Sequence, residues 1–116
     1  GTLQYGVEEL STPLLVVMGH TRCGAVKATV EAIEKRSAPT GTEIDSLIGA
    51  ISPSVTEAEE AGAKGEDLLT VVMSNNIDRV ASQLAGAKVL SLAVKSLKLK
   101  IVGAIYDTDT GEVSFS

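Results

Sequence analysis

The chain has 116 residues, of which 44% are hydrophobic and 3% aromatic, and its formal net charge at pH 7 is −5. This size and composition predict a single domain, residues 1–116, with an aliphatic core. The negative net charge and the lack of a Lys/Arg cluster argue against nucleic-acid binding. The apolar runs are too short to span a membrane. The single cysteine excludes an internal disulfide, and a free thiol predicts a location in the reducing cytoplasm.

The first third of the sequence predicts a helix, a strand and a second helix. Apolar residues at helical spacing predict the first helix from Gly1 to Leu10, and Ser11-Thr12-Pro13 ends it. The apolar run from Leu14 to Met18 is typical of a buried strand. Apolar residues return at helical spacing from Gly24 to Lys35, which predicts the second helix.

The middle of the sequence predicts helices separated by loops. Arg36 to Thr42 is rich in loop-forming residues, and the small residues from Ala61 to Gly65 predict a second loop. Glu43 to Ile51 predicts a short amphipathic helix, and Pro53 is expected to break this pattern or to start another helix. The longest helical pattern, Glu66 to Leu84, has its apolar residues on one side: Leu69, Val72, Met73, Ile77, Val80 and Leu84.

The last third predicts a helix and a hairpin. Val89 to Leu97 fits a helix, although Val89 and Leu90 also fit the start of a strand. Leu99 to Tyr106 predicts a strand, Asp107 to Gly111 a turn, and Glu112 to Phe115 a partly exposed strand. The last two strands therefore form a hairpin at an edge, and the whole pattern belongs to the α/β class.

A histidine and a cysteine follow the first predicted strand. Ligands of open α/β sheets bind beyond the carboxyl ends of strands, and the imidazole of His20 and the thiolate of Cys23 are ligand types that zinc favours. The helix N-terminus beside Cys23 favours the thiolate, and Gly19 and Gly24 are expected to permit unusual backbone conformations or close approaches. The spacing alone leaves open a buried thiol beside a backbone-bonded histidine, or a nucleophile–base pair without an identified orienting group.

Three segments carry a resemblance to one enzyme family. Gly19-His20-Thr21-Arg22-Cys23-Gly24-Ala25-Val26-Lys27-Ala28 resembles the second zinc motif of the β-class carbonic anhydrases. Leu3 to Leu10 resembles the helix before that motif's strand. Leu99 to Asp107, followed by Thr110-Gly111-Glu112-Val113, resembles the closing strand and hairpin of the family.

The resemblance implies a fold, a metal and a reaction. The fold would be a central, mostly parallel β-sheet flanked by helices, with the C-terminal hairpin at its edge. Zinc would be held by His20 and Cys23, and Tyr5 would line the substrate pocket, while Arg22 is expected to face solvent at the helix start. The reaction would be reversible hydration of carbon dioxide to bicarbonate, in a homodimer or higher homo-oligomer with sites at the interface.

The resemblance also implies that part of the site lies elsewhere. Family members carry an earlier Cys-x-Asp-x-Arg segment, which supplies another zinc thiolate and an Asp–Arg pair, and these 116 residues contain no such segment. The domain is therefore expected to be incomplete at its N-terminal side, with the third ligand supplied from outside, for example by a separate N-terminal chain. The alternatives are a catalytically inactive carbonic anhydrase-like domain that retains the fold and the oligomer interface, and hydrolysis of another small linear molecule such as carbon disulfide.

Overall fold

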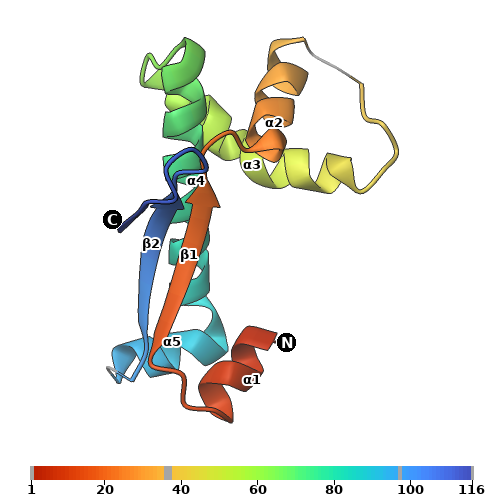
Figure 1. Cartoon of the computed structure of the whole chain (residues 1–116). Helices are drawn as coiled ribbons and strands as arrows, with labels where there is room; N and C mark the ends of the chain where they lie inside the picture. The colour runs from red at the N-terminus through yellow and green to blue at the C-terminus, as the bar shows by residue number, and fades with distance from the viewer. Residues whose placement is uncertain (1, 36–37, 97, 116) are drawn as a thin grey trace.

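The structure is an α/β arrangement in which a small sheet packs against helices (Figure 1). It is a computed structural model that describes residues 2–35, 38–96 and 98–115, so the predictions made for Gly1, Arg36, Ser37 and Leu97 lie outside the described residues. The elements follow the order α1 (Thr2–Glu8), β1 (Leu14–His20), α2 (Gly24–Glu34), α3 (Ile44–Glu60), α4 (Gly65–Gly86), α5 (Lys88–Lys95), β2 (Lys100–Tyr106) and β3 (Val113–Phe115).

In the described ranges, the sheet has three strands in the order β1-β2-β3. β1 and β2 are parallel, with Leu14 opposite Lys100 and His20 opposite Tyr106, and the chain between them forms the crossover through α2, α3, α4 and α5. β2 and β3 are antiparallel, with Tyr106 opposite Val113. The predicted parallel pairing and the predicted hairpin at the edge of the sheet are both confirmed.

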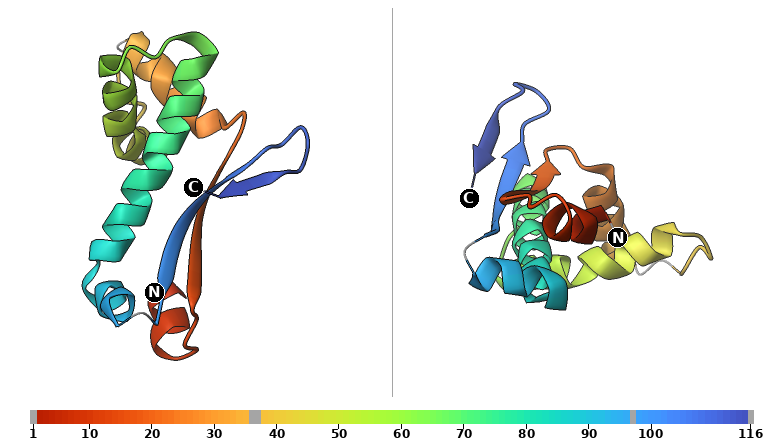
Figure 2. Two further views of the ribbon diagram at one scale, coloured as in Figure 1. Left: turned by 90° about the vertical axis from the view of Figure 1, so that its left-hand side faces the viewer. Right: turned by 90° about the horizontal axis from the view of Figure 1, so that it is seen from below.

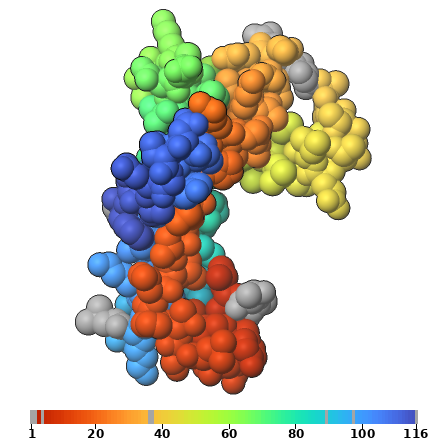
Figure 3. Space-filling model, viewed as in Figure 1, coloured from red at the N-terminus to blue at the C-terminus, as the bar shows by residue number. Residues whose placement is uncertain are grey.

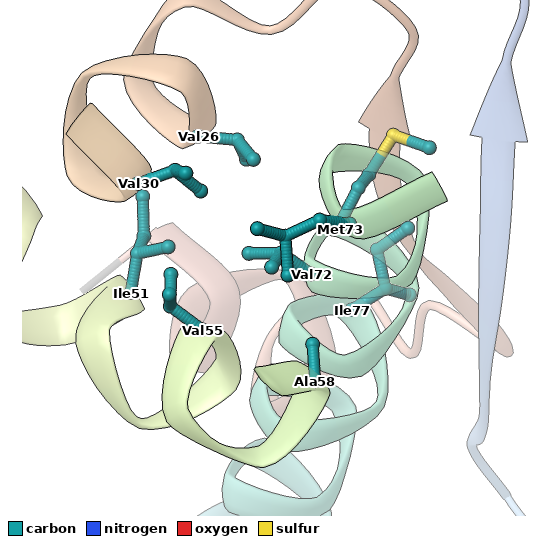
Figure 4. Close-up of a cluster of buried hydrophobic side chains, with 9 residues drawn as sticks. Val26, Val30, Ile51, Val55, Ala58, Val72, Met73 and Ile77 are labelled. Carbon is teal, nitrogen blue, oxygen red and sulfur yellow. The ribbon is translucent and has the colours of Figure 1, made fainter. Parts of the chain in front are cut away.

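The buried core lies mainly among α2, α3 and α4 (Figure 4). Val55, Ala58 and Val72 are fully buried at its centre. Val17 of β1 and Ile105 of β2 pack against this cluster and join the sheet to the helices. The rest of the cluster is aliphatic, as the composition predicts: Val26, Val30, Ile51, Leu68, Met73 and Ile77.

The two faces of β1 have different surroundings. Val17 and Gly19 face α4, which lies along one side of the β1–β2 pair (Figure 2). Leu14, Val16 and Met18 point to the opposite face, where their exposed fractions are 49%, 37% and 52%. Figure 3 shows β1, in orange, uncovered on this side. Among the residues that the structure describes, the sheet is therefore flanked by helix on one face and has an open apolar face on the other.

The predicted end of β1 was two residues too early. The strand continues past Met18 because Gly19 pairs with Ile105 and His20 with Tyr106 of β2. The apolar run ends before the ladder does. His20 is consequently the last residue of β1, and its backbone position is set by pairing with Tyr106 of β2.

Pro53 does not interrupt the third helix, contrary to the prediction. α3 runs from Ile44 to Glu60 with Pro53 inside it. A proline removes one helical hydrogen bond and strains the preceding turn. Ile51 and Val55 are buried on either side of Pro53, and this packing keeps the helix continuous.

One further detail of the helices differs from the sequence pattern, and the helix predicted from Val89 is confirmed. The buried face of α4 includes Leu68, whereas Leu69 is only half-buried. Residues 88–95 form helix α5, so the alternative of a strand start at Val89 is wrong.

Within the described ranges, no helix combines the length and the apolar character needed to cross a membrane.

Candidate metal centre

His20 and Cys23 lie together where β1 ends and α2 begins. His20 is the last residue of β1, and Cys23 is the N-cap of α2, with an extended backbone at φ −69° and ψ 116°. The carbonyl oxygen of Cys23 accepts the N–H of Lys27 at 3.1 Å, which closes the first turn of the helix. The strand therefore fixes one candidate ligand and the helix start fixes the other.

Both side chains line one pocket of about 390 Å³. The predicted pair is thus brought together in space at the carboxyl end of β1. The other walls come from α2 and α4, and the full lining is His20, Thr21, Arg22, Cys23, Val26, Lys27, Leu69, Thr70 and Met73.

Tyr5 lies at the other end of the strand. Its helix, α1, is next to the start of β1, and the side chain is 60% exposed (Figure 1). A seven-residue strand is about 20 Å long, so Tyr5 and His20 are separated by the length of β1. Within one chain, Tyr5 is not part of the pocket that His20 and Cys23 line.

The imidazole of His20 is oriented by the backbone that follows it. Its Nδ1 lies 2.9 Å from the carbonyl oxygen of Thr21. A carbonyl oxygen only accepts hydrogen bonds, so Nδ1 carries the proton in this arrangement. The neutral ring then has its lone pair on Nε2, which is the form that a metal ion requires.

The β1–α2 loop, residues 21–23, is attached to the β2–β3 turn, residues 107–112. The backbone N–H of Thr21 donates to the carbonyl oxygen of Tyr106 at 3.0 Å. The hydroxyl Oγ1 of Thr21 accepts the N–H of Thr108 at 2.9 Å and lies 2.9 Å from the Thr108 hydroxyl. Residues 87 positions apart in sequence therefore hold the loop in place.

Arg22 adopts a left-handed backbone, with φ at 56°. Its guanidinium lies 3.1 Å from the carboxylate of Asp109, and the two side chains are 75% and 54% exposed. This confirms the predicted solvent-facing position of Arg22. An ion pair this exposed contributes little to stability, so the loop conformation depends mainly on the Thr21 contacts.

The acidic residues of the β2–β3 turn stabilise the turn itself. Asp107 Oδ1 accepts the N–H of Asp109 at 2.9 Å and that of Thr110 at 3.4 Å. The carbonyl oxygen of Asp107 accepts the N–H of Gly111 at 2.8 Å. The predicted turn from Asp107 to Gly111 is confirmed.

The two glycines that flank the motif have different roles. A β-carbon at Gly19 would lie 2.7 Å from Ile77 Cδ1, so β1 approaches α4 more closely than a larger residue allows. This confirms the expected close approach. A β-carbon at Gly24 would meet no atom within 4 Å, and Gly24 has no positive φ, so the same expectation is wrong for Gly24.

The donor set fits zinc, although these residues alone do not complete a site. Imidazole nitrogen and thiolate sulfur are common zinc ligands, and a catalytic zinc takes three protein ligands. Among the residues that the structure describes, no group of three or more His, Cys, Asp and Glu side chains is placed to hold a metal ion. His20 and Cys23 are therefore two candidate ligands of such a site.

Several pocket residues were not singled out from the sequence as parts of the site. Val26, Leu69 and Met73 form its apolar wall. Their helical spacing identifies them as helix-packing residues but does not indicate which of them border the motif. Thr108 had no sequence signal, because its contact with Thr21 depends on the parallel pairing of β1 with β2.

Comparison with known proteins identifies a family. The carbonic anhydrase family model matches residues 1–113. A carbonic anhydrase of Mycolicibacterium smegmatis is 31% identical over 113 residues, which cover 97% of this chain and 53% of the relative.

Solved structures share the fold. The β-carbonic anhydrase CcaA superposes with a TM-score of 0.78 at 24% identity, over 97% of this chain and 55% of that one. A structure from work on two tetrameric β-carbonic anhydrases of Sordaria macrospora gives a TM-score of 0.82 at 18% identity, over 97% and 56%. The chain thus spans about half the length of the relatives that it matches.

Proposed function

We propose, since this chain belongs to the carbonic anhydrase family, that His20 and Cys23 are two ligands of a catalytic zinc ion in an enzyme that interconverts carbon dioxide and bicarbonate. One observation carries this proposal: the two side chains line the same pocket at the carboxyl end of β1. The shared fold of the β-carbonic anhydrases supports it.

The chain's own residues prepare the two ligands. The Thr21 carbonyl oxygen holds the Nδ1 proton of His20, which leaves Nε2 for the metal. Cys23 is the N-cap of α2, so the start of the helix fixes its place in the pocket beside His20. When bound, zinc lowers the pKa of a water molecule to about 7 and so supplies hydroxide at neutral pH.

The pocket wall suits the proposed substrate and product. Carbon dioxide is small and has no net dipole, and Val26, Leu69 and Met73 offer it an apolar surface. Lys27 lines the same pocket and adds a positive charge, which favours the bicarbonate anion. Residues of α2 and α4 would therefore bind and orient the substrate and product, while His20 at the end of β1 and Cys23 at the start of α2 would hold the metal.

The remaining ligand and the Asp–Arg pair are proposed to come from outside these 116 residues. The sequence has one His and one Cys, and both are already assigned. Leu14, Val16 and Met18 form the open face of β1, and His20 is the next residue on the same face of the strand. A run that is apolar on both faces is typical of a strand that is covered on both faces. We therefore propose that the polypeptide that completes the metal site also covers this face of β1.

A homo-oligomer is the proposed working form, in the cytoplasm where the thiol of Cys23 stays reduced. The Sordaria macrospora relatives are described as tetrameric. Tyr5 is exposed and one strand length away from His20, so a pocket role for Tyr5 requires a second copy of the chain. Its phenol would then line the partner's pocket rather than its own.

The experiment is a stopped-flow carbon dioxide hydration assay on the zinc-loaded native protein. We expect fast hydration that is lost in His20→Ala and in Cys23→Ser, because each substitution removes a zinc ligand. Glu59→Gln, on the exposed side of α3, is the control and should retain full activity. A zinc-loaded protein without hydration activity would instead indicate a catalytically inactive domain.

A further inference from the structure

We propose that Thr21 is a positioning residue for His20 and that the β2–β3 turn holds Thr21 through Thr108. The role in metal binding rests on the proposed function, because it requires that His20 is a zinc ligand. The structural part of the proposal, which concerns the orientation and tautomer of the His20 ring, can be tested without any metal.

Every polar group of Thr21 has a partner, and the partners divide into two sets. The N–H donates to Tyr106, and Oγ1 accepts the N–H of Thr108 and contacts the Thr108 hydroxyl, so one set ties Thr21 to β2 and the turn. The second set consists of His20 alone, whose Nδ1–H donates to the carbonyl oxygen of Thr21 at 2.9 Å. Thr21 therefore transmits the position of the turn to the imidazole.

The turn is a suitable anchor because its own conformation is fixed. The carboxylate of Asp107 accepts two backbone N–H groups of the turn, from Asp109 and Thr110. Gly111 supplies the left-handed backbone at φ 78° that closes the turn. The N–H of Thr108 is thus presented to Thr21 by a preorganised segment.

The loop needs such an anchor because of its backbone. Arg22 has a positive φ, which is unfavourable for a residue other than glycine. Its ion pair with Asp109 is exposed to solvent and contributes little. Without the Thr21–Thr108 contacts, the loop would relax, the Thr21 carbonyl oxygen would leave Nδ1, and the proton of His20 would redistribute between the two ring nitrogens.

The first test is 15N NMR of the imidazole in the metal-free chain at about pH 8.5, where an ordinary imidazole is neutral. The sequence contains a single histidine, so the ring nitrogen signals belong to His20 alone. We expect the Nδ1–H tautomer to dominate in the wild-type chain and in Thr21→Ser, which keeps the hydroxyl. Thr21→Val should raise the Nε2–H population, because it removes the acceptor for Thr108.

Two further variants make the test specific. Thr56→Val is the matched control, since the Thr56 hydroxyl donates to Ser52 within α3 at 3.3 Å and should leave the tautomer unchanged. Thr108→Val keeps the N–H but removes the hydroxyl contact, and should shift the tautomer in the same direction as Thr21→Val by a smaller amount. If Thr21→Val does not fold, Thr108→Val decides. An Nε2–H tautomer in the wild-type chain, or no change in the folded variants, would overturn the proposal.

The second test is zinc affinity of the native protein, measured by competition with a chelator. Loss of an outer partner of a metal ligand typically weakens metal binding 10- to 100-fold, and we expect a loss of about tenfold in Thr21→Val that Thr21→Ser restores. Zinc binding that is unchanged in His20→Ala would mean that the proposed function fails while the tautomer result stands. Zinc binding that depends on His20 but not on Thr21 would overturn the positioning role alone.

Discussion

Gly19 of β1 lies so close to α4 that a β-carbon at its position would be 2.7 Å from Cδ1 of Ile77. Met73 Cγ would be 3.0 Å away on the same helix. This contact is made by the residue directly before His20, and Met73 also lines the pocket. The spacing between β1 and α4 therefore positions the segment that carries His20 and Cys23 as well as the core.

The first prediction concerns this spacing. Gly19→Ala should lower the free energy of unfolding by about 1–3 kcal/mol, because the added methyl group overpacks a buried contact. Gly49→Ala is the matched control: a β-carbon there would meet no atom within 4 Å, and alanine favours helix α3 by up to about 1 kcal/mol. Urea denaturation measures both variants. Equal effects of the two substitutions would contradict the close approach of β1 to α4.

The second prediction concerns a buried hydroxyl. Ser54 is fully buried, and among the described residues its Oγ has no hydrogen-bond partner. Ser54→Ala should therefore raise the free energy of unfolding by about 1 kcal/mol, because it removes an unsatisfied polar group. In contrast, Ser52→Ala removes a bond of 2.6 Å to Ile48 and should be neutral or destabilising. A loss of stability in Ser54→Ala, measured by urea denaturation, would contradict the prediction.

The third prediction concerns pH. The pKa of Asp45 is lowered from its ordinary value of 3.8, chiefly by the hydrogen bond from the Thr40 N–H and further by that from the Gly41 N–H. A lowered pKa in the folded state means that the ionised carboxylate stabilises the fold at pH values above 3.8 and that this contribution disappears as the pH falls through the folded-state pKa.

NMR titration of the Asp45 carboxyl group measures this directly. Its pKa should be below 3.8 in the wild-type chain, and the difference in stability between the wild type and Asp45→Asn should shrink as the pH falls below 3.8. Thr40→Val, which removes the hydroxyl donor at 3.0 Å, should move the pKa back toward 3.8. A stability difference that grows toward acid would show that the sign is wrong.

The fourth prediction concerns the open face of the sheet. Met18→Glu should prevent the completing polypeptide from covering β1, because it places a charge in an apolar contact. Light scattering after size exclusion should then give a smaller mass than for the native protein. Leu47→Glu is the matched control, since Leu47 is 53% exposed on α3 and Met18 is 52% exposed on β1. The assignment fails if Leu47→Glu reduces the mass and Met18→Glu does not.

Much of the fold could be predicted from the sequence because hydrophobic spacing reports local structure. The strand in Leu14 to Met18 and the helix from Gly24 were recognised from this spacing. Tertiary contacts determined the features that hydrophobic spacing did not predict. Pairing with β2 extends β1 as far as His20, and packing in the core keeps α3 continuous at Pro53. The choice of Leu68 over Leu69 for the buried face of α4 likewise depends on where α3 and α2 lie.

The candidate site could be predicted only where its residues are close in sequence. His20 and Cys23 were recognised because a short loop necessarily brings them near each other at the end of a strand. The contact of Thr21 with Thr108 joins segments 87 residues apart, and no local pattern encodes it. Resemblance to a family singled out His20 and Cys23 as candidate zinc ligands, whereas the contacts around the His20 ring became visible only in the structure.

The most direct test of the central claim is the intact mass and zinc content of the native, unfused protein, compared with His20→Ala and Cys23→Ser. We predict about one zinc per site in a species that carries polypeptide beyond these 116 residues, and loss of zinc in both variants. A chain of 12.0 kDa that holds stoichiometric zinc by itself and hydrates carbon dioxide rapidly would contradict the external third ligand. Zinc that remains bound in both variants would contradict the assignment of His20 and Cys23 as its ligands.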